Sequence, residues 1–181
     1  MGVLDIPSWH GEDYESDWGL LDVEGRVVLD IGADYGSTAA FFLNKGAVKV
    51  ICVESYDNDY AALAELAKGE PRIEAIHRHV ASSVDFETLV VTYQPDVVKI
   101  DCEGCEALLL GVRPCVLRRV EQFGIELHNE ATSIQCGNPH GKGNDLMPLF
   151  EKFFTKQVGG VTITPLYQNK WVLHIKKVGA R

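Results

Sequence analysis

Short apolar runs alternate with helical stretches along most of this 181-residue chain, and the alternation restricts the folds open to it. Five runs suited to buried strands lie at residues 27–31, 48–53, 72–79, 96–100 and 123–127. The spacing of apolar residues predicts helices between them over 37–44 and 58–67, and a helical or irregular piece over 83–93. Strands that alternate with helices form an α/β fold with a mostly parallel sheet and helices on both faces.

The end of the chain departs from this alternation. A loop-like segment at 132–144 and a helical one at 146–154 lead to two apolar runs, 161–166 and 171–175, with no helix between them. These two runs predict an antiparallel hairpin at one edge of the sheet. We therefore expect one domain over residues 25–181.

Residues 1–24 form a separate N-terminal segment that is polar and aromatic, without clean periodicity. Its aromatic and imidazole side chains are Trp9, His10, Tyr14 and Trp18. The segment is either a lid over a binding site or a flap packed on the sheet. The flap is favoured, because a terminus must be anchored to be ordered.

The charge of the chain bears on its partners and its location. The formal net charge is −9 and the basic residues are scattered, whereas binding a phosphate backbone needs clustered Lys and Arg. We therefore expect no nucleic-acid partner. No apolar run reaches the length of a membrane span, so no membrane partner is expected. Five cysteines without a secretory leader favour reduced thiols and a cytoplasmic protein.

A glycine-containing turn follows the first strand and predicts a ligand site. Gly32 and Gly36 let the backbone bend sharply after the run that ends at Ile31. Dinucleotide-binding proteins carry a further glycine where this chain has Asp34, and an acid there would repel a pyrophosphate. A cationic ligand without phosphate, such as S-adenosylmethionine, tolerates it.

An acid at the end of the second strand supports the same interpretation. Glu54 lies 22 positions after Gly32, close to the roughly 20 positions expected for a residue that binds ribose hydroxyls. The turn and the acid, in this order on one strand–helix–strand unit, together predict an adenosine-type cofactor.

Three acids follow the fourth strand: Asp101, Glu103 and Glu106. Ligands of open α/β sheets bind at the carboxyl ends of the strands, so these acids are candidates for chemistry. Glu103 and Glu106, three positions apart, would also share one helix face. The alternative is helix capping, in which acids of the first turn offset the helix dipole and Asp101 is the N-cap. Both interpretations stay open at this point.

The chain resembles the FkbM-type S-adenosylmethionine-dependent methyltransferases over about residues 25–130. The resemblance rests on the segments Asp30–Gly36, Val98–Glu106 and Ile125–His128 and on Glu54. It implies a seven-stranded Rossmann-like class I fold, S-adenosyl-L-methionine as cofactor, and methyl transfer to a hydroxyl of a small molecule or sugar. The implied cofactor-binding residues are Asp30, Gly32, Ala33, Asp34, Gly36, Glu54, Ser55 and Asp101. Asp34 and Ser55 depart from the family, which often has Asn and Pro there.

Within this resemblance we expect Asp101 near the methionine part of the donor and Glu103 or Glu106 at the acceptor. His128 is the general-base candidate, because an unperturbed imidazole titrates near neutrality. A half-buried structural histidine is the alternative. The whole chain could also be a non-catalytic module that binds an adenosine-containing ligand or a partner. The sequence does not indicate an oligomeric state.

Two sets of side chains in the sequence are of types that bind metals. Cys102, Cys105, Cys136 and His140 could hold zinc, although two separate thiols at Cys102 and Cys105 are favoured. Asp101, Glu103, Glu126 or His128 could hold a divalent cation, but nothing in the sequence requires one. No metal is therefore assigned from the sequence.

Overall fold

The computed structural model of the protein describes residue 4 and residues 13–128, 143–167 and 171–179. Seven strands form one sheet in the order β3-β2-β1-β4-β5-β7-β6. Their bounds are β1 Val27–Ile31, β2 Lys49–Glu54, β3 Ile73–His77, β4 Val97–Ile100, β5 Gln122–Leu127, β6 Val161–Tyr167 and β7 Trp171–Lys177. Strands β1 to β5 are parallel, whereas β7 is antiparallel to both β5 and β6. The predicted Rossmann-like fold, with seven strands and an antiparallel edge hairpin, is confirmed.

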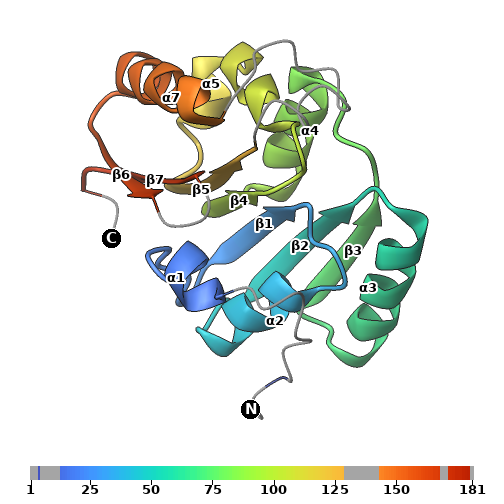
Figure 1. Ribbon diagram of the computed structural model, residues 1–181. Helices are drawn as coiled ribbons and strands as arrows, with labels where there is room; N and C mark the ends of the chain where they lie inside the picture. Colours follow the sequence, from blue (N-terminus) through green and yellow to red (C-terminus); the bar gives the residue numbers. More distant parts are fainter. Residues whose placement is uncertain (1–3, 5–12, 129–142, 168–170, 180–181) are drawn as a thin grey trace.

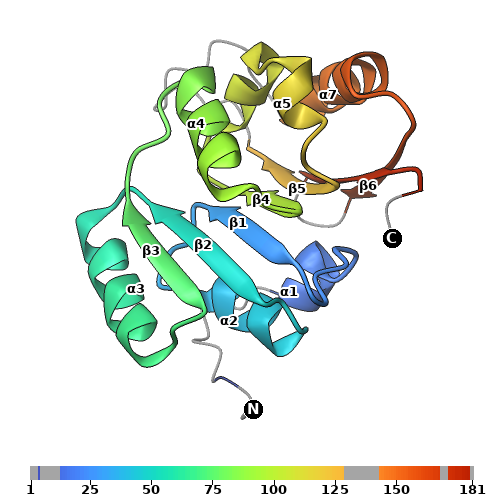
Figure 2. The ribbon, with the colours of Figure 1, turned by 180° about the vertical axis from the view of Figure 1, so that it is seen from behind.

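Helices cover both faces of this sheet (Figures 1 and 2). One face carries α1 Tyr14–Trp18, α2 Ser37–Asn44 and α3 Asp57–Gly69. The other carries α4 Ser83–Tyr93, the 3₁₀ helix η1 Glu106–Gly111, α5 Pro114–Leu117 and α7 Gly143–Gln157. None of the helices in the described part of the chain is long and apolar enough to cross a bilayer.

Alternate residues of the central strands pack into two separate hydrophobic cores, one on each face of the sheet. In β1, Val28 belongs to the core under α1, α2 and α3, while Leu29 and Ile31 belong to the core under α4, α5 and α7. Central parallel strands are buried on both faces, which explains their nearly continuous apolar runs. Asp30 and Lys99 interrupt these runs, although both are buried.

The described part of the N-terminal segment packs on the sheet. Trp18 in α1 is 1% exposed and lies against β5 at Gly124, where an added Cβ would be 3.1 Å from the indole ring. Tyr14 lies beside Phe41 of α2, with ring centroids 6.0 Å apart. Trp9 and His10 lie outside the described residues, so the lid remains untested and the boundary at residue 24 remains a prediction.

The loop after β4 corrects three expectations from the sequence. No helix begins at Asp101: the chain passes through left-handed conformations at Glu103 (φ 56°) and Gly104 (φ 119°), and η1 begins only at Glu106. The N-cap position belongs to Cys105, so the alternative of an N-cap at Asp101 and the shared helix face of Glu103 and Glu106 are both wrong. Two left-handed residues in succession are incompatible with a helical turn.

Cys102 and Cys105 form a disulfide across this loop, with their Cα atoms 5.5 Å apart. The prediction of two separate thiols is therefore wrong for this pair. Sulfur atoms bonded to each other cannot act as thiolate ligands, so Cys102 and Cys105 do not supply two of the four zinc ligands considered from the sequence. Cys136 and His140 lie outside the described residues.

Candidate functional site

The glycine turn joins the carboxyl ends of β1 and β4. Gly32 has a φ of 75°, and a Cβ at this position would lie 1.7 Å from the carbonyl oxygen of Asp101. The backbone N–H of Asp101 donates to the carbonyl of Ile31 at 3.0 Å. Only glycine satisfies both the left-handed conformation and the close approach. Gly32 therefore brings the first strand's turn against Asp101.

Glu54 connects this turn to the end of β2. One carboxylate oxygen, Oε2, accepts the backbone N–H of Asp34 at 2.9 Å, and Oε1 accepts those of Ser55 and Tyr56 at 2.6 and 2.8 Å. Asp34 is itself held in a left-handed conformation, with φ 50°. The acid predicted to bind a ribose thus lies directly beside the glycine turn.

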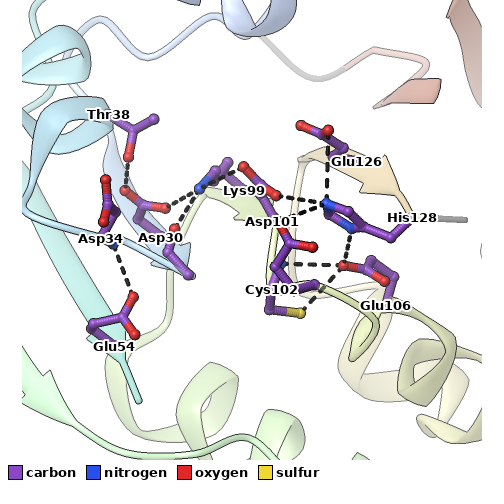
Figure 3. Close-up of polar contacts among 12 residues, drawn as sticks. Asp30, Asp34, Thr38, Glu54, Lys99, Asp101, Cys102, Glu106, Glu126 and His128 are labelled. Atoms are coloured by element: carbon purple, nitrogen blue, oxygen red, sulfur yellow. Dashed lines mark hydrogen bonds and ion pairs between the residues drawn. The ribbon is translucent and has the colours of Figure 1, made fainter. Parts of the chain in front are cut away.

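A buried ion pair lies beneath the turn (Figure 3). Lys99 faces Asp30 across the β1–β4 ladder, with Nζ 3.1 Å from Oδ1, and Nζ donates to the carbonyl of Gly32 at 2.7 Å. Burial raises the pKa of Asp30 and is opposed by Lys99, whose own pKa is raised by Asp30 and Asp101 against the effect of burial. Thr38 also donates to Asp30. The ion pair therefore stabilises the glycine turn through the hydrogen bond from Lys99 to the Gly32 carbonyl.

The sequence interpretation did not assign a role to Lys99. A lysine within the apolar run Val97–Ile100 was the signal that could have identified it, since a buried ammonium needs an acidic partner. The matching acid, Asp30, interrupts the apolar run of the neighbouring strand in the same way.

His128, directly after β5, lies beside Asp101, Glu106 and Glu126 (Figure 3), and Glu103 is a fourth acid near the ring. Its Nδ1 is 2.9 Å from Glu106 Oε1, and its Nε2 is 3.4, 3.5 and 3.7 Å from oxygens of Asp101, Glu103 and Glu126. Burial lowers the pKa of the imidazole, but Glu106 foremost, then Asp101 and Glu103, outweigh burial and raise it to about 9. Near neutral pH the ring is then cationic, so in this state it does not act as a base.

The loop and turns enclose one side of a cavity of about 1040 Å³. The predicted site residues that line it are Gly32, Asp34, Glu54, Ser55, Asp101, Glu103 and His128. The four others, Asp30, Ala33, Gly36 and Glu106, are buried and do not line the cavity. Tyr14 of the N-terminal segment also lines the cavity, together with residues that the sequence did not assign to a site, among them Asp59, Arg78 and His79. They come from α1, α3 and the segment after β3, which only the tertiary structure brings to this edge.

The cavity is predominantly acidic. Six carboxyl groups line it, at Asp34, Glu54, Asp59, Asp101, Glu103 and Glu126, against the two permanently basic side chains of Arg78 and Lys99. Burial raises the pKa of Asp34 to about 6, an effect increased by Asp59 and Glu54. Such a surface favours a cationic ligand over a polyphosphate.

No protein-family model matches the sequence. Two viral proteins of uncharacterized function are similar over 117 residues, or 65% of this chain. Protein 65 of Sulfolobus islandicus filamentous virus (isolate Iceland/Hveragerdi) is 29% identical, with 68% of its length covered. Protein 158B of Sulfolobus islandicus rod-shaped virus 1 is 30% identical, with 70% covered.

Solved structures with the same fold share little sequence with this chain. Fibrillarin of Aeropyrum pernix, with natively bound S-adenosyl-L-methionine, has a TM-score of 0.55 at 14% identity, covering 86% of this chain and 68% of its own. The fibrillarin pre-rRNA processing protein of Methanococcus jannaschii has a TM-score of 0.58 at 14% identity, and the match covers 89% of this chain and 70% of that protein. Precorrin-6y C5,15-methyltransferase of Geobacter metallireducens has a TM-score of 0.55 at 14% identity, and the match covers 85% of this chain and 81% of that protein. At this identity the likeness establishes the fold alone.

Proposed function

We propose that this chain, which belongs to the same family as protein 158B of Sulfolobus islandicus rod-shaped virus 1, is an S-adenosylmethionine-dependent methyltransferase. We further propose a hydroxyl group on a small molecule or sugar as its acceptor, as in the FkbM-type enzymes that its motifs resemble. The shared fold of fibrillarin, which holds S-adenosyl-L-methionine, supports the choice of donor.

The observation that carries the proposal is the hydrogen bond from the Asp34 N–H to Glu54 Oε2 at 2.9 Å. It joins the glycine turn of β1 to the acid that ends β2, at the carboxyl edge where α/β sheets bind nucleosides. We propose that Glu54 and Ser55 hold the ribose end of the donor. In this arrangement Gly32 and Asp34 lie beside the central part of the donor, and Asp101 lies near its methionine part.

The acidic lining supports this donor over a dinucleotide. An ammonium and a sulfonium are both cations, and the six carboxyl groups of the cavity would attract them and repel a pyrophosphate. Arg78 and Lys99 are the two permanently basic groups in the lining, and Lys99 is already paired with Asp30 and Asp101. Charge thus favours S-adenosylmethionine over NAD.

Methyl transfer needs an oriented acceptor oxygen and a route for its proton. S-adenosylmethionine would supply the electrophilic methyl when bound, and Glu54, Ser55 and Asp101 would hold it. Glu103, exposed at the cavity rim, is placed to bind an acceptor hydroxyl. His128 could accept the proton only as a neutral ring, which its pKa of about 9 disfavours at neutral pH.

Calorimetric titration of the protein with S-adenosylmethionine, S-adenosylhomocysteine and NAD tests the donor. We expect the two adenosyl compounds to bind at least tenfold more tightly than NAD, and Glu54→Gln to weaken them by more than tenfold, equivalent to about 1.4 kcal/mol. Equal affinity for NAD would contradict the proposal.

Glu65→Gln is the matched control, because Glu65 lies on the exposed surface of α3, where it pairs with Lys68. It should leave donor affinity unchanged. Because Glu54 also ties two turns together, the melting temperature of Glu54→Gln must be measured in parallel. Loss of binding without loss of folding supports a direct contact.

The same purified protein distinguishes the two alternatives, a non-catalytic module and an RNA methyltransferase. Donor binding without turnover on any hydroxyl acceptor would favour the non-catalytic module. Salt-dependent RNA binding would favour an RNA acceptor, which the net charge of −9 argues against.

A further inference from the structure

We infer that Asp101, Glu126 and His128 form a binding site for a divalent metal cation. Asp101 and His128 directly follow the neighbouring strands β4 and β5, and Glu126 lies near the end of β5, so the ladder between these strands fixes their spacing. One oxygen of each acid and Nε2 of the imidazole all lie within 4.8 Å of one another. Figure 3 shows Asp101 and Glu126 turned toward the same edge of the imidazole ring.

The distances between donor atoms fit a single ion. Nε2 of His128 is 3.4 Å from Asp101 Oδ1 and 3.7 Å from Glu126 Oε1. Metal–ligand bonds of about 2.1 Å place adjacent ligands about 3 Å apart and opposite ligands about 4 Å apart in an octahedral site. Two carboxylates and one imidazole suit Mn²⁺, Fe²⁺, Zn²⁺ or Mg²⁺.

The orientation of His128 is set by a second carboxylate behind it. Nδ1 donates to Glu106 Oε1 at 2.9 Å, so Nε2 is the ring nitrogen that faces Asp101 and Glu126. A bound cation replaces the proton on Nε2 and takes up its lone pair. Histidine ligands of metals are usually held in this way, by a carboxylate on the other ring nitrogen. Glu106 is 0% exposed and also accepts the backbone N–H groups of Cys102 and Gly104, each at 3.2 Å.

The charge of this cluster also calls for a cation. Among the described residues, five carboxyl groups, at Asp30, Asp101, Glu103, Glu106 and Glu126, surround the two basic groups of Lys99 and His128. In addition, Oε2 of Glu106 is buried without a hydrogen-bond partner in the described part of the chain. A divalent ion between Asp101, Glu126 and His128 reduces this excess of negative charge.

The site opens into the cavity, since all three ligands line it. Coordination positions on that side are open to water or to an acceptor oxygen, whose proton a bound cation makes easier to remove. This role in catalysis rests on the proposed methyl transfer, whereas binding of the ion does not.

Titration of EDTA-treated protein with Mn²⁺ alone, followed by electron paramagnetic resonance, tests the site without any donor or acceptor. Mn²⁺ is chosen because it prefers carboxylate and imidazole ligands over thiolates. We expect one ion bound per chain, and at least tenfold weaker binding in Glu126→Gln and in His128→Gln. Mg²⁺ should compete with Mn²⁺.

Asp59→Asn is the matched control, because it removes one acid from the same cavity outside the cluster. It should leave Mn²⁺ affinity within about twofold. Thermal unfolding in EDTA checks that each variant folds, and added Mn²⁺ should raise the melting temperature of the wild type and of Asp59→Asn but not of Glu126→Gln.

No Mn²⁺ binding by the wild type at millimolar concentration, or equal binding by all variants, would overturn the site. Donor titration separates the two proposals. Mn²⁺ binding without S-adenosylmethionine binding retains the metal site and removes the proposed function. The reverse result removes only the metal site.

Discussion

Asp30 and Lys99 show how single residues determine the stability of this site. Lys99→Met would leave the Asp30 carboxyl buried without its cation, and breaking a buried pair in this way costs about 3–5 kcal/mol of unfolding free energy. We expect that loss in urea unfolding followed by circular dichroism. The double variant Asp30→Asn/Lys99→Met should be more stable than the sum of the single effects, because it removes both charges.

Lys49→Met provides the comparison for this prediction. Lys49 pairs with Glu74 at 2.6 Å on the surface, where both side chains are about two-fifths exposed. Loss of this surface ion pair should lower the free energy of unfolding by less than about 1 kcal/mol. An equal cost for Lys49→Met and Lys99→Met would show that the buried pair has no special role.

At the scale of elements, the docking of α1 on the sheet depends on the absence of a side chain at Gly124. A Cβ there would lie 2.9 Å from Leu21 Cδ1 and 3.1 Å from Trp18 Cε3. Gly124→Val should therefore displace α1 and destabilise the protein by roughly 1–3 kcal/mol, the usual cost of overpacking. Near-ultraviolet circular dichroism and thermal unfolding would detect both effects.

Gly69→Ala is the corresponding change where space is available. Gly69 ends α3, and an added Cβ meets nothing within 4 Å among the described atoms. This variant should be neutral or more stable by up to about 1 kcal/mol. If Gly124→Val were equally well tolerated, α1 would not be held by the contact between Trp18 and β5.

For the whole molecule, the carboxylates around His128 predict a pH dependence of stability. The pKa of His128 is about 9 in the folded protein and near 6.5 when unfolded, so the folded state holds the proton more tightly. This stabilisation is fully present below pH 6.5 and is lost as the pH rises through 9. The opposite shift at His174, whose pKa burial lowers, acts only below this range.

Urea unfolding of metal-free protein between pH 6 and 9.5 measures this effect. The stability difference between wild type and His128→Gln should shrink as the pH rises, since the proton on His128 contributes only in the wild type. A difference that does not vary with pH would show that the acids do not hold the imidazole as a cation. EDTA must be present, because a bound metal would replace the proton.

The sequence by itself determined the order and kind of the central elements. The periodicity of apolar residues predicted β1 and α2 with their observed bounds, and it predicted the closing pair of strands as an antiparallel edge. This is possible because the spacing of apolar side chains depends on whether one or both faces of an element are buried. The glycine turn and Glu54 were likewise recognised locally, and their proximity was confirmed by a hydrogen bond.

Only the tertiary structure decided what surrounds His128. Glu103 and Glu106 were expected on one helix face, but two left-handed residues and a disulfide direct them to different nitrogens of the same ring. Contacts between the ends of β4 and β5 join residues more than twenty positions apart, and no local pattern specifies such distances. Strand pairing sets them, because parallel strands bring their carboxyl ends to one edge.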